Sequence, residues 1–341
     1  MITVESVAID DPRSRALWVE QQDELAARYG SPDLASDFAE KMPPDELLAS
    51  LLAVGADGEP VGTGLLRWSP YETGAGSVEV KRLYVRPAHR GHGHSRVIMG
   101  AIERVAWRAG AVRLVLETGD EQPEAIALYR AIGYSDYMQF GPYVGDPRSV
   151  CFTKELPARV LVLNGTMGAG KTEIAGASFT LLADAGAHVA QIDADWLCQA
   201  SPAPVGDRFH ERLMFANLKA IAPNFRDAGI GLLLVPRPVE DVRGRDDFAR
   251  AFADATAGPA QVAIVRLEAS EETRQERLKA REPEAFYEAF ARARTVELAA
   301  SIESLDLDDA VVDNDGRHRD DVAREVLAAA DWWVPGVQPL A

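Results

Sequence analysis

Cysteine is scarce in this chain, with two residues, Cys151 and Cys198, among 341. The two stand far apart in the sequence and form no metal-ligand spacing, so the sequence offers neither a disulfide framework nor a cysteine-based metal site. We expect both to be reduced, structural thiols, and neither to act as a nucleophile.

Positive charge and long apolar runs are also in short supply. Lys and Arg number 36 against 53 Asp and Glu, which gives a net charge of −17 at pH 7. This balance argues against an extended nucleic-acid footprint, because phosphate backbones require clustered Lys and Arg. No apolar run approaches the roughly 20 residues of a membrane span, and the first residues lack the pattern of a secretory signal. We therefore expect a cytoplasmic protein without nucleic-acid or membrane partners, and we leave homodimerisation open.

The length of 341 residues and the order of the expected elements predict two α/β domains. We place the first at residues 1–156 and the second at residues 158–335, with almost no linker between them. In the first domain we expect a mobile loop up to Pro44, a short helix at residues 45–51 and a hairpin turn at Asp57-Gly58.

The most specific motif lies at mid-chain, where residues 159–172 read RVLVLNGTMGAGKT. An apolar strand leads into a loop that matches G-x-x-x-x-G-K-[ST], and a helix-compatible segment follows. In this motif glycines let backbone N–H groups surround phosphates, the lysine reaches the terminal phosphates and the hydroxyl ligates Mg²⁺. A chance glycine-rich turn is the alternative, but it would not explain the apolar strand. The loop therefore predicts a Mg·ATP site made by Gly165, Thr166, Met167, Gly168, Ala169, Gly170, Lys171 and Thr172, with Thr172 on the metal.

A second glycine-containing loop, RGHGHS at residues 90–95, lies between a strand at 78–85 and an amphipathic helix at 96–109. Small residues at a helix N-terminus let backbone amides approach an anion. Through the segments VKRLYVRPAHRGHGHS, RLVLETG and AIALYRAIGY, residues 1–156 resemble the GNAT family of N-acetyltransferases. The resemblance implies a mixed, mostly antiparallel twisted sheet with helices, and acetyl-CoA as the acetyl donor.

The resemblance also implies roles for individual residues. Tyr129 matches the tyrosine that protonates the departing thiolate, and Glu79 on the central strand is the candidate base for the acceptor amine. A packed aromatic for Tyr129 and a solvated strand residue for Glu79 are the alternatives. The acetyl-CoA contacts would come from the backbone of Leu83 and Val85, for the pantetheine arm, and from Arg90, Gly91, His92, Gly93, His94, Ser95 and Arg96, for the pyrophosphate.

Strand and helix alternation from 159 to 333 predicts a parallel sheet flanked by helices. Asp193 and Asp195 follow its second strand, at the edge where open α/β sheets bind substrates. We assign Asp193 to Mg²⁺ and Asp195 to the catalytic base, with helix capping as the alternative. This half resembles the P-loop kinases of small molecules and nucleotides, whose lid arginines close over ATP. Here Arg274 and Arg277 would do so, unless their helix is merely solvated and laced with Glu–Arg pairs.

Together the two resemblances predict a bifunctional transferase, in which an acetyl-CoA-dependent N-acetyltransferase is joined to a Mg·ATP-dependent phosphotransferase. The acceptors would be a small amine and a small-molecule hydroxyl, on an antibiotic or a metabolite. Two alternatives stay open: an acetyltransferase regulated by a nucleotide-sensing second domain, and an enzyme that modifies protein or RNA. No Asp ends the third strand, where Val235 meets Pro236, which departs from the ATPase motor pattern. The predicted catalytic groups are Glu79, Tyr129, Lys171 and Asp195.

Overall fold

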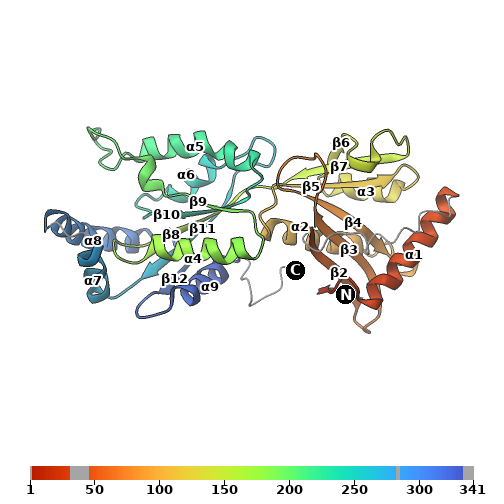
Figure 1. Cartoon of the computed structure of the whole chain (residues 1–341), viewed down its shortest axis with the longest axis horizontal. Coiled ribbons are helices and arrows are strands. Elements are labelled where there is room, and N and C mark those ends of the chain that lie inside the picture. Colours follow the sequence, from red (N-terminus) through yellow and green to blue (C-terminus); the bar gives the residue numbers. More distant parts are fainter. Residues whose placement is uncertain (1, 31–45, 282–284, 333–341) are drawn as a thin grey trace. The chain divides into compact units, whose positions relative to one another are not determined.

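The structure is a computed structural model that describes residues 2–30, 46–281 and 285–332. The described chain divides into two compact units, residues 2–156 (unit 1) and 157–332 (unit 2). Each unit carries its own β-sheet (Figure 1), and the two sheets differ in topology.

Unit 1 is built on a seven-stranded mixed sheet in the order β1-β2-β3-β4-β5-β7-β6. Neighbouring strands are antiparallel, except that β4 and β5 run parallel. The mixed, mostly antiparallel sheet expected for residues 1–156 is therefore confirmed. Its strands are β1 (Ile2–Val7), β2 (Leu47–Gly55), β3 (Pro60–Trp68), β4 (Ser77–Val85), β5 (Arg113–Gly119), β6 (Ser135–Tyr137) and β7 (Ser149–Glu155).

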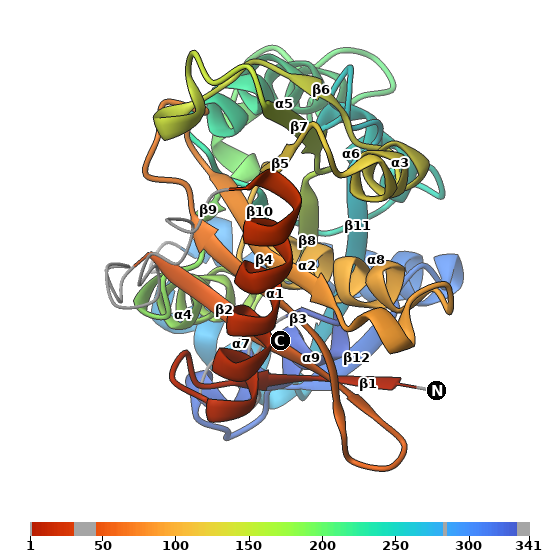
Figure 2. The ribbon, with the colours of Figure 1, turned by 90° about the vertical axis from the view of Figure 1, so that its right-hand side faces the viewer.

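Helices cover both faces of this sheet. α2 (His94–Arg108) and α3 (Pro123–Ala131) bury side chains such as Ile98 and Tyr129 in the main core with strand residues of β5. α1 (Pro12–Tyr29) lies across β2, β3 and β4 on the other face (Figure 2), where Leu17 and Trp18 are buried. Two single turns of 3₁₀-helix, η2 (Pro87–His89) and η3 (Gly141–Tyr143), complete the described elements of the unit.

The helix expected at residues 45–51 is wrong, because β2 begins at Leu47. β2 pairs with β1 on one side and with β3 on the other, and its middle residues are buried. Pairing along both edges outweighs the helix propensity of LLASLLA. The hairpin at Asp57-Gly58 is confirmed, with Gly58 at φ 86°. The loop expected up to Pro44 falls largely at residues 31–45, outside the described residues.

Unit 2 is built on five parallel strands in the order β12-β11-β8-β10-β9. α4 and α9 pack on one face of this sheet, and α5 and α6 pack on the other (Figure 1). The expected parallel sheet flanked by helices is confirmed. The strands are β8 (Arg159–Asn164), β9 (Val189–Gln191), β10 (Leu232–Pro236), β11 (Gln261–Glu268) and β12 (Ala310–Asp313). The helices are α4 (Lys171–Asp184), η4 (Ala194–Leu197), α5 (Glu211–Asp227), α6 (Gly244–Ala251), α7 (Glu271–Arg281), α8 (Ala285–Leu305) and α9 (Arg319–Ala329).

Within the described ranges, no helix combines the length and the hydropathy that a membrane span requires.

Candidate active site

The parallel pair of β4 and β5 opens part-way along its length. The two strands pair from Ser77 with Arg113 to Val80 with Leu116, although both continue beyond that point. The register between β3 and β4 shifts next to Arg82, whose φ is 54°. A bulge of this kind bends a strand and increases its twist. The bend falls where β4 separates from β5. The last residues of β4 therefore face an opening on that side, where β5 would otherwise pair with them.

The glycine loop stands at the end of this opening and leads directly into α2. Gly91 and Gly93 both have φ 79°, which glycine adopts without steric cost. Gly93 is the N-cap of α2 and has no side chain to cap it. The first N–H groups of α2 and the positive end of its dipole therefore suit an anion.

A cavity of about 230 Å³ lies among this loop, β4, α1 and α3. Most residues that the sequence predicted for acetyl-CoA chemistry meet there, whereas His92 and Arg96 are not among the lining residues. Gln21 and Glu24 of α1 and Gln122 line it as well. Sequence reasoning missed these three, because their segments carry no motif. The predicted residues in the lining are Leu83, Val85, Arg90, Gly91, Gly93, His94, Ser95 and Tyr129.

Arg90 positions the loop more than it offers a free cation. Its guanidinium donates to Glu24 at 3.0 and 2.6 Å, and its Nε donates to the carbonyl of Val85 at 2.9 Å. The carbonyl of Leu83 accepts from Gln21 Nε2 at 3.0 Å. These contacts tie the loop and β4 to α1, and they leave anion binding chiefly to the loop backbone and the start of α2.

Tyr129 is buried in the wall of the cavity, with 5% of its surface exposed. Its ring packs against Tyr134 and Phe152, with centroids 5.9 and 5.7 Å away. Burial raises the pKa of the Tyr129 hydroxyl far above its ordinary value, and the negative charge of Glu117 adds to this effect. The hydroxyl therefore stays protonated at neutral pH, which a proton donor requires.

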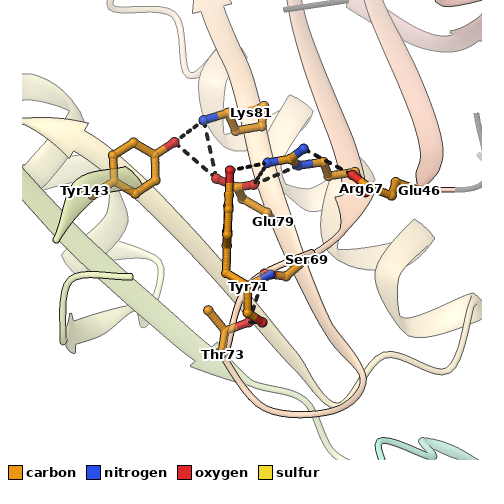
Figure 3. A network of polar contacts seen from close by, with 8 residues as sticks. All are labelled: Glu46, Arg67, Ser69, Tyr71, Thr73, Glu79, Lys81 and Tyr143. Atoms are coloured by element: carbon orange, nitrogen blue, oxygen red, sulfur yellow. Dashed lines mark hydrogen bonds and ion pairs between the residues drawn. The ribbon is translucent and has the colours of Figure 1, made fainter. Parts of the chain in front are cut away.

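Glu79 is the centre of a buried polar network on β4 (Figure 3). Its Oε2 accepts from Arg67 Nε and Nη2 at 2.8 and 2.6 Å, and its Oε1 accepts from the Tyr143 hydroxyl at 3.2 Å. Lys81 Nζ lies 3.3 Å from the same Oε1, and Glu79 itself is 0% exposed. The alternative of a solvated strand residue is therefore wrong. Glu79 does not line the cavity that Tyr129 lines.

Comparisons with known proteins agree with this geometry. A family model described as the acetyltransferase (GNAT) family matches residues 14–134. An IAA acetyltransferase of Azospirillum brasilense is 41% identical over 105 residues, which are 31% of this chain and 67% of that protein. The chain belongs to the GNAT acetyltransferase family.

Other relatives cover less or are more distant. A streptothricin acetyltransferase of Streptomyces lavendulae is 33% identical over 86 residues, 25% of this chain and 44% of that protein. The crystal structure of the PaiA N-acetyltransferase of Thermoplasma acidophilum in complex with coenzyme A is 16% identical, with a TM-score of 0.35, and covers 46% of this chain and 99% of that one.

Outside the GNAT unit, the loop at residues 165–172, called the phosphate loop here after its sequence motif, lies between β8 and α4, in the strand-to-helix context that the motif requires. Lys171 Nζ donates to the carbonyls of Gly165 and Thr166 at 2.9 and 2.8 Å. Gly170 has φ 96°, and a Cβ there would lie 2.3 Å from Asn314 Nδ2. Asn314 in turn donates to the carbonyl of Ala169 at 2.8 Å. The loop therefore curls around the lysine and is held in place from the end of β12.

A cavity of about 410 Å³ opens beside this loop. Gly165, Thr166 and Arg274 instead line a separate hollow of about 430 Å³, and Ala169 is fully buried. The predicted residues that line the first cavity are Met167, Gly168, Gly170, Lys171, Thr172, Asp195 and Arg277.

Asp193 and Asp195 differ in what they can reach. Asp193 caps η4, because its Oδ1 accepts the N–H of Asp195 at 3.1 Å, and it is absent from the residues that line the cavity. The capping alternative therefore describes Asp193. Asp195 lines the cavity, keeps 60% of its side chain exposed and forms an ion pair with Arg237.

The arginines of α7 contact the phosphate loop directly. Arg274 Nη1 donates to Thr166 Oγ1 at 3.1 Å, and Arg277 donates to the carbonyls of Gly168 and Asn314 at 3.3 and 2.8 Å. Arg274 and Arg277 are therefore not simply solvated residues of α7. They tie α7 to the loop.

Sequence reasoning missed two further residues of this cavity, Arg294 and Phe209. Arg294 of α8 lies over the Phe209 ring, 4.3 Å from its centroid, and pairs with Glu240. Arg237 and Glu240 also line the cavity, from the segment at the end of β10. Nothing in the sequence connects Arg294 or Phe209 with the loop, because the fold brings them in from distant segments.

Proposed function

We propose that unit 1 transfers an acetyl group from acetyl-CoA to the primary amine of a small molecule. The observation that carries the proposal is the cavity in which the free edge of β4, the glycine loop and Tyr129 meet. Each part of this cavity would bind a different portion of acetyl-CoA or take part in the transfer. Backbone groups of Leu83 and Val85 would hold the pantetheine arm, and the amides at the start of α2 would hold the pyrophosphate.

Tyr129 would protonate the sulfur as the carbon–sulfur bond breaks, because its buried hydroxyl keeps its proton at neutral pH. The acceptor is a small amine, and the net charge of −17 does not favour nucleic acid as the alternative. A relative is a streptothricin acetyltransferase, so streptothricin is a suitable first acceptor to try.

For unit 2 we propose binding of Mg·ATP and transfer of its terminal phosphoryl group to a small-molecule hydroxyl. The motif at residues 165–172, its position between a buried parallel strand and a helix, and the arginines that contact it support this activity. Lys171 and Arg277 would stabilise charge on the transferring phosphoryl group. Asp195, held by Arg237 and open to the cavity, would accept the proton of the attacking hydroxyl.

Thr172 is the residue best suited to hold Mg²⁺, because it lines the cavity beside the phosphate loop. The described residues contain no group of three or more His, Cys, Asp or Glu that could hold a metal ion. Mg²⁺ in nucleotide sites usually takes one or two protein ligands and completes its shell with water and phosphate oxygens. The single hydroxyl therefore fits, whereas Asp193 caps η4 and does not line the cavity.

Mass spectrometry of streptothricin and an amine library, incubated with the protein, acetyl-CoA and Mg·ATP, tests both activities. Each donor is also omitted in turn. Tyr129→Phe should slow acetyl transfer and leave phosphoryl transfer unchanged, and Lys171→Ala should do the reverse. If ATP binds and is never consumed, unit 2 is a nucleotide sensor and the kinase proposal fails. If no compound gains an acetyl group and acetyl-CoA does not bind, the proposal for unit 1 fails.

A further inference from the structure

One face of the unit 1 sheet carries charged side chains that the acetyl-CoA cavity does not use. Side chains alternate between the two faces of a strand, so the register assigns Glu79 of β4, Val115 and Glu117 of β5, and Cys151 of β7 to the same face. Aromatic side chains from beyond these strands pack against Val115 and Cys151 there. They are Tyr71, Tyr137, Phe140 and Tyr143.

Glu79, the base expected from the sequence, is closed to an acceptor. It is 0% exposed, and the donors drawn in Figure 3 occupy both of its carboxylate oxygens. An amine would have to displace Tyr143 or Lys81 to reach it. The network therefore fits a structural role, in which Glu79 holds β3, β4 and the segment at Tyr143 together.

Glu117 stands in a different position on the same face. It follows Leu116, the last residue of β5 that pairs with β4, so it lies where the two strands separate. Its Oε1 accepts from the Ser149 hydroxyl at 2.8 Å, and no other side-chain hydrogen bond to its carboxylate occurs in the described part of the chain. It is partly exposed, and it is close enough to Tyr129 to affect the titration of that residue.

We propose that the acceptor amine binds on this face at the end of β5, and that Glu117 accepts its proton. The inference rests on the proposed acetyl transfer and names the residue that performs its first step. The thioester would enter where β4 and β5 separate, beyond Val80 and Leu116. Glu117 and Tyr129 would thus lie on the two sides of the thioester, as base and acid.

The proton balance of the reaction is met by these two residues. Glu117 takes one proton from the ammonium group and passes it to water. The neutral nitrogen then bonds to the carbonyl carbon, and the carbon–sulfur bond breaks with its electron pair on sulfur. The nitrogen loses its second proton as the amide forms, while Tyr129 gives a proton to the sulfur and regains one from solvent. The products are the acetamide, CoA thiol and one proton.

The environment of Glu117 suits a base at neutral pH. Burial raises the pKa of the Glu117 carboxyl, while the Ser149 hydroxyl and the charge of Lys81 offset part of that rise. Asp146 and Glu79 are the other charged groups that act on it, and both raise its pKa. A general base works best when its pKa approaches the working pH.

Two small amines of similar size show whether Glu117 acts as a base or only has a structural role. Methylamine is an ammonium ion at neutral pH, whereas hydroxylamine is largely neutral and needs no base to become a nucleophile. With acetyl-CoA and methylamine, Glu117→Gln should release CoA about 100-fold more slowly than the wild type. With hydroxylamine the two proteins should agree within about threefold. Glu72→Gln removes an exposed carboxylate on a neighbouring turn and serves as the matched control.

Equal losses with both amines, or no loss with methylamine, would overturn the assignment. If the wild type binds acetyl-CoA but acetylates neither amine, the same two proteins are compared with an acceptor found in the amine library. Glu117→Gln should again release CoA about 100-fold more slowly, and an unchanged rate would refute the proposal. Failure to bind acetyl-CoA would refute the function of unit 1 instead.

Discussion

Arg67→Met tests whether the network around Glu79 stabilises unit 1. The side chains of Arg67 and Glu79 are 6% and 0% exposed, and two hydrogen bonds join them. The substitution keeps much of the apolar stem and removes the charge, which leaves a buried carboxylate short of a partner. Breaking a buried ion pair in this way costs about 3–5 kcal/mol.

Lys81 lies 3.3 Å from Glu79 and is not changed by the substitution, so we expect the lower end of that range, about 3 kcal/mol. In a unit of this size each kcal/mol lowers the melting temperature by about 2–4 °C, which gives a fall of about 6–12 °C. Hydrogen exchange of peptides from β3 and β4, combined with calorimetry, assigns the loss to unit 1.

The comparison with an exposed pair makes the test specific. Arg130 and Asp136 lie 3.0 Å apart with 57% and 70% of their side chains exposed, so Arg130→Met should cost less than about 1 kcal/mol. The double variant Arg67→Met/Glu79→Met should lose less than the sum of the two single variants, because it leaves no buried charge. Equal costs for Arg67→Met and Arg130→Met, or strictly additive losses in the double variant, would refute this reasoning.

Three further substitutions address the two sites. Gly170→Ala should abolish ATP binding, measured by calorimetry, and spare acetyl-CoA binding, because the added Cβ would lie 2.3 Å from Asn314 Nδ2 at a φ of 96°. Ser149→Ala should move the acidic limb of the pH–rate profile to higher pH, since the Ser149 hydroxyl lowers the pKa of Glu117; a limb that stays in place would contradict this. Gly119→Ala should weaken acetyl-CoA binding, because its Cβ would lie 1.8 Å from the Tyr29 hydroxyl and push the end of α1 away from α3.

The positions of both glycine loops could be predicted from the sequence because their geometry is local. A strand, glycines at positive φ and the start of a helix follow one another within a few residues, so the order along the chain already states the geometry. Residues of β4, the loop at residues 90–95 and α3 line one cavity. Segments that follow one another in the sequence therefore also meet in space. The expected helix at residues 45–51 failed for the opposite reason, since pairing with β1 and β3 decides that segment.

The surroundings of each carboxylate could not be predicted, because they depend on register. Glu79 faces Arg67 only because β3 and β4 pair Arg67 with Glu79 across an antiparallel ladder, and a one-residue slip would turn both side chains to the other face. Glu117 carries no motif, and its position just past Leu116, the last residue of β5 that pairs with β4, appears only once the two strands are aligned. The same holds for Arg237, which meets Asp195 from the end of a different strand.

In both units a glycine loop follows a strand, but the two strands differ in how they are paired. This difference bears on where the proposed chemistry of each unit would lie. In each, a glycine loop leads from a strand into a helix whose first N–H groups suit phosphate. β8 is paired on both sides along its length, so the reacting groups of the proposed phosphoryl transfer would come from neighbouring strand ends and α7. β4 instead loses its partner β5 after Val80, which opens the sheet itself. A thioester held along β4, as we propose, would be accessible from both faces, so that Glu117 on one face and Tyr129 on the other would act on the same carbonyl.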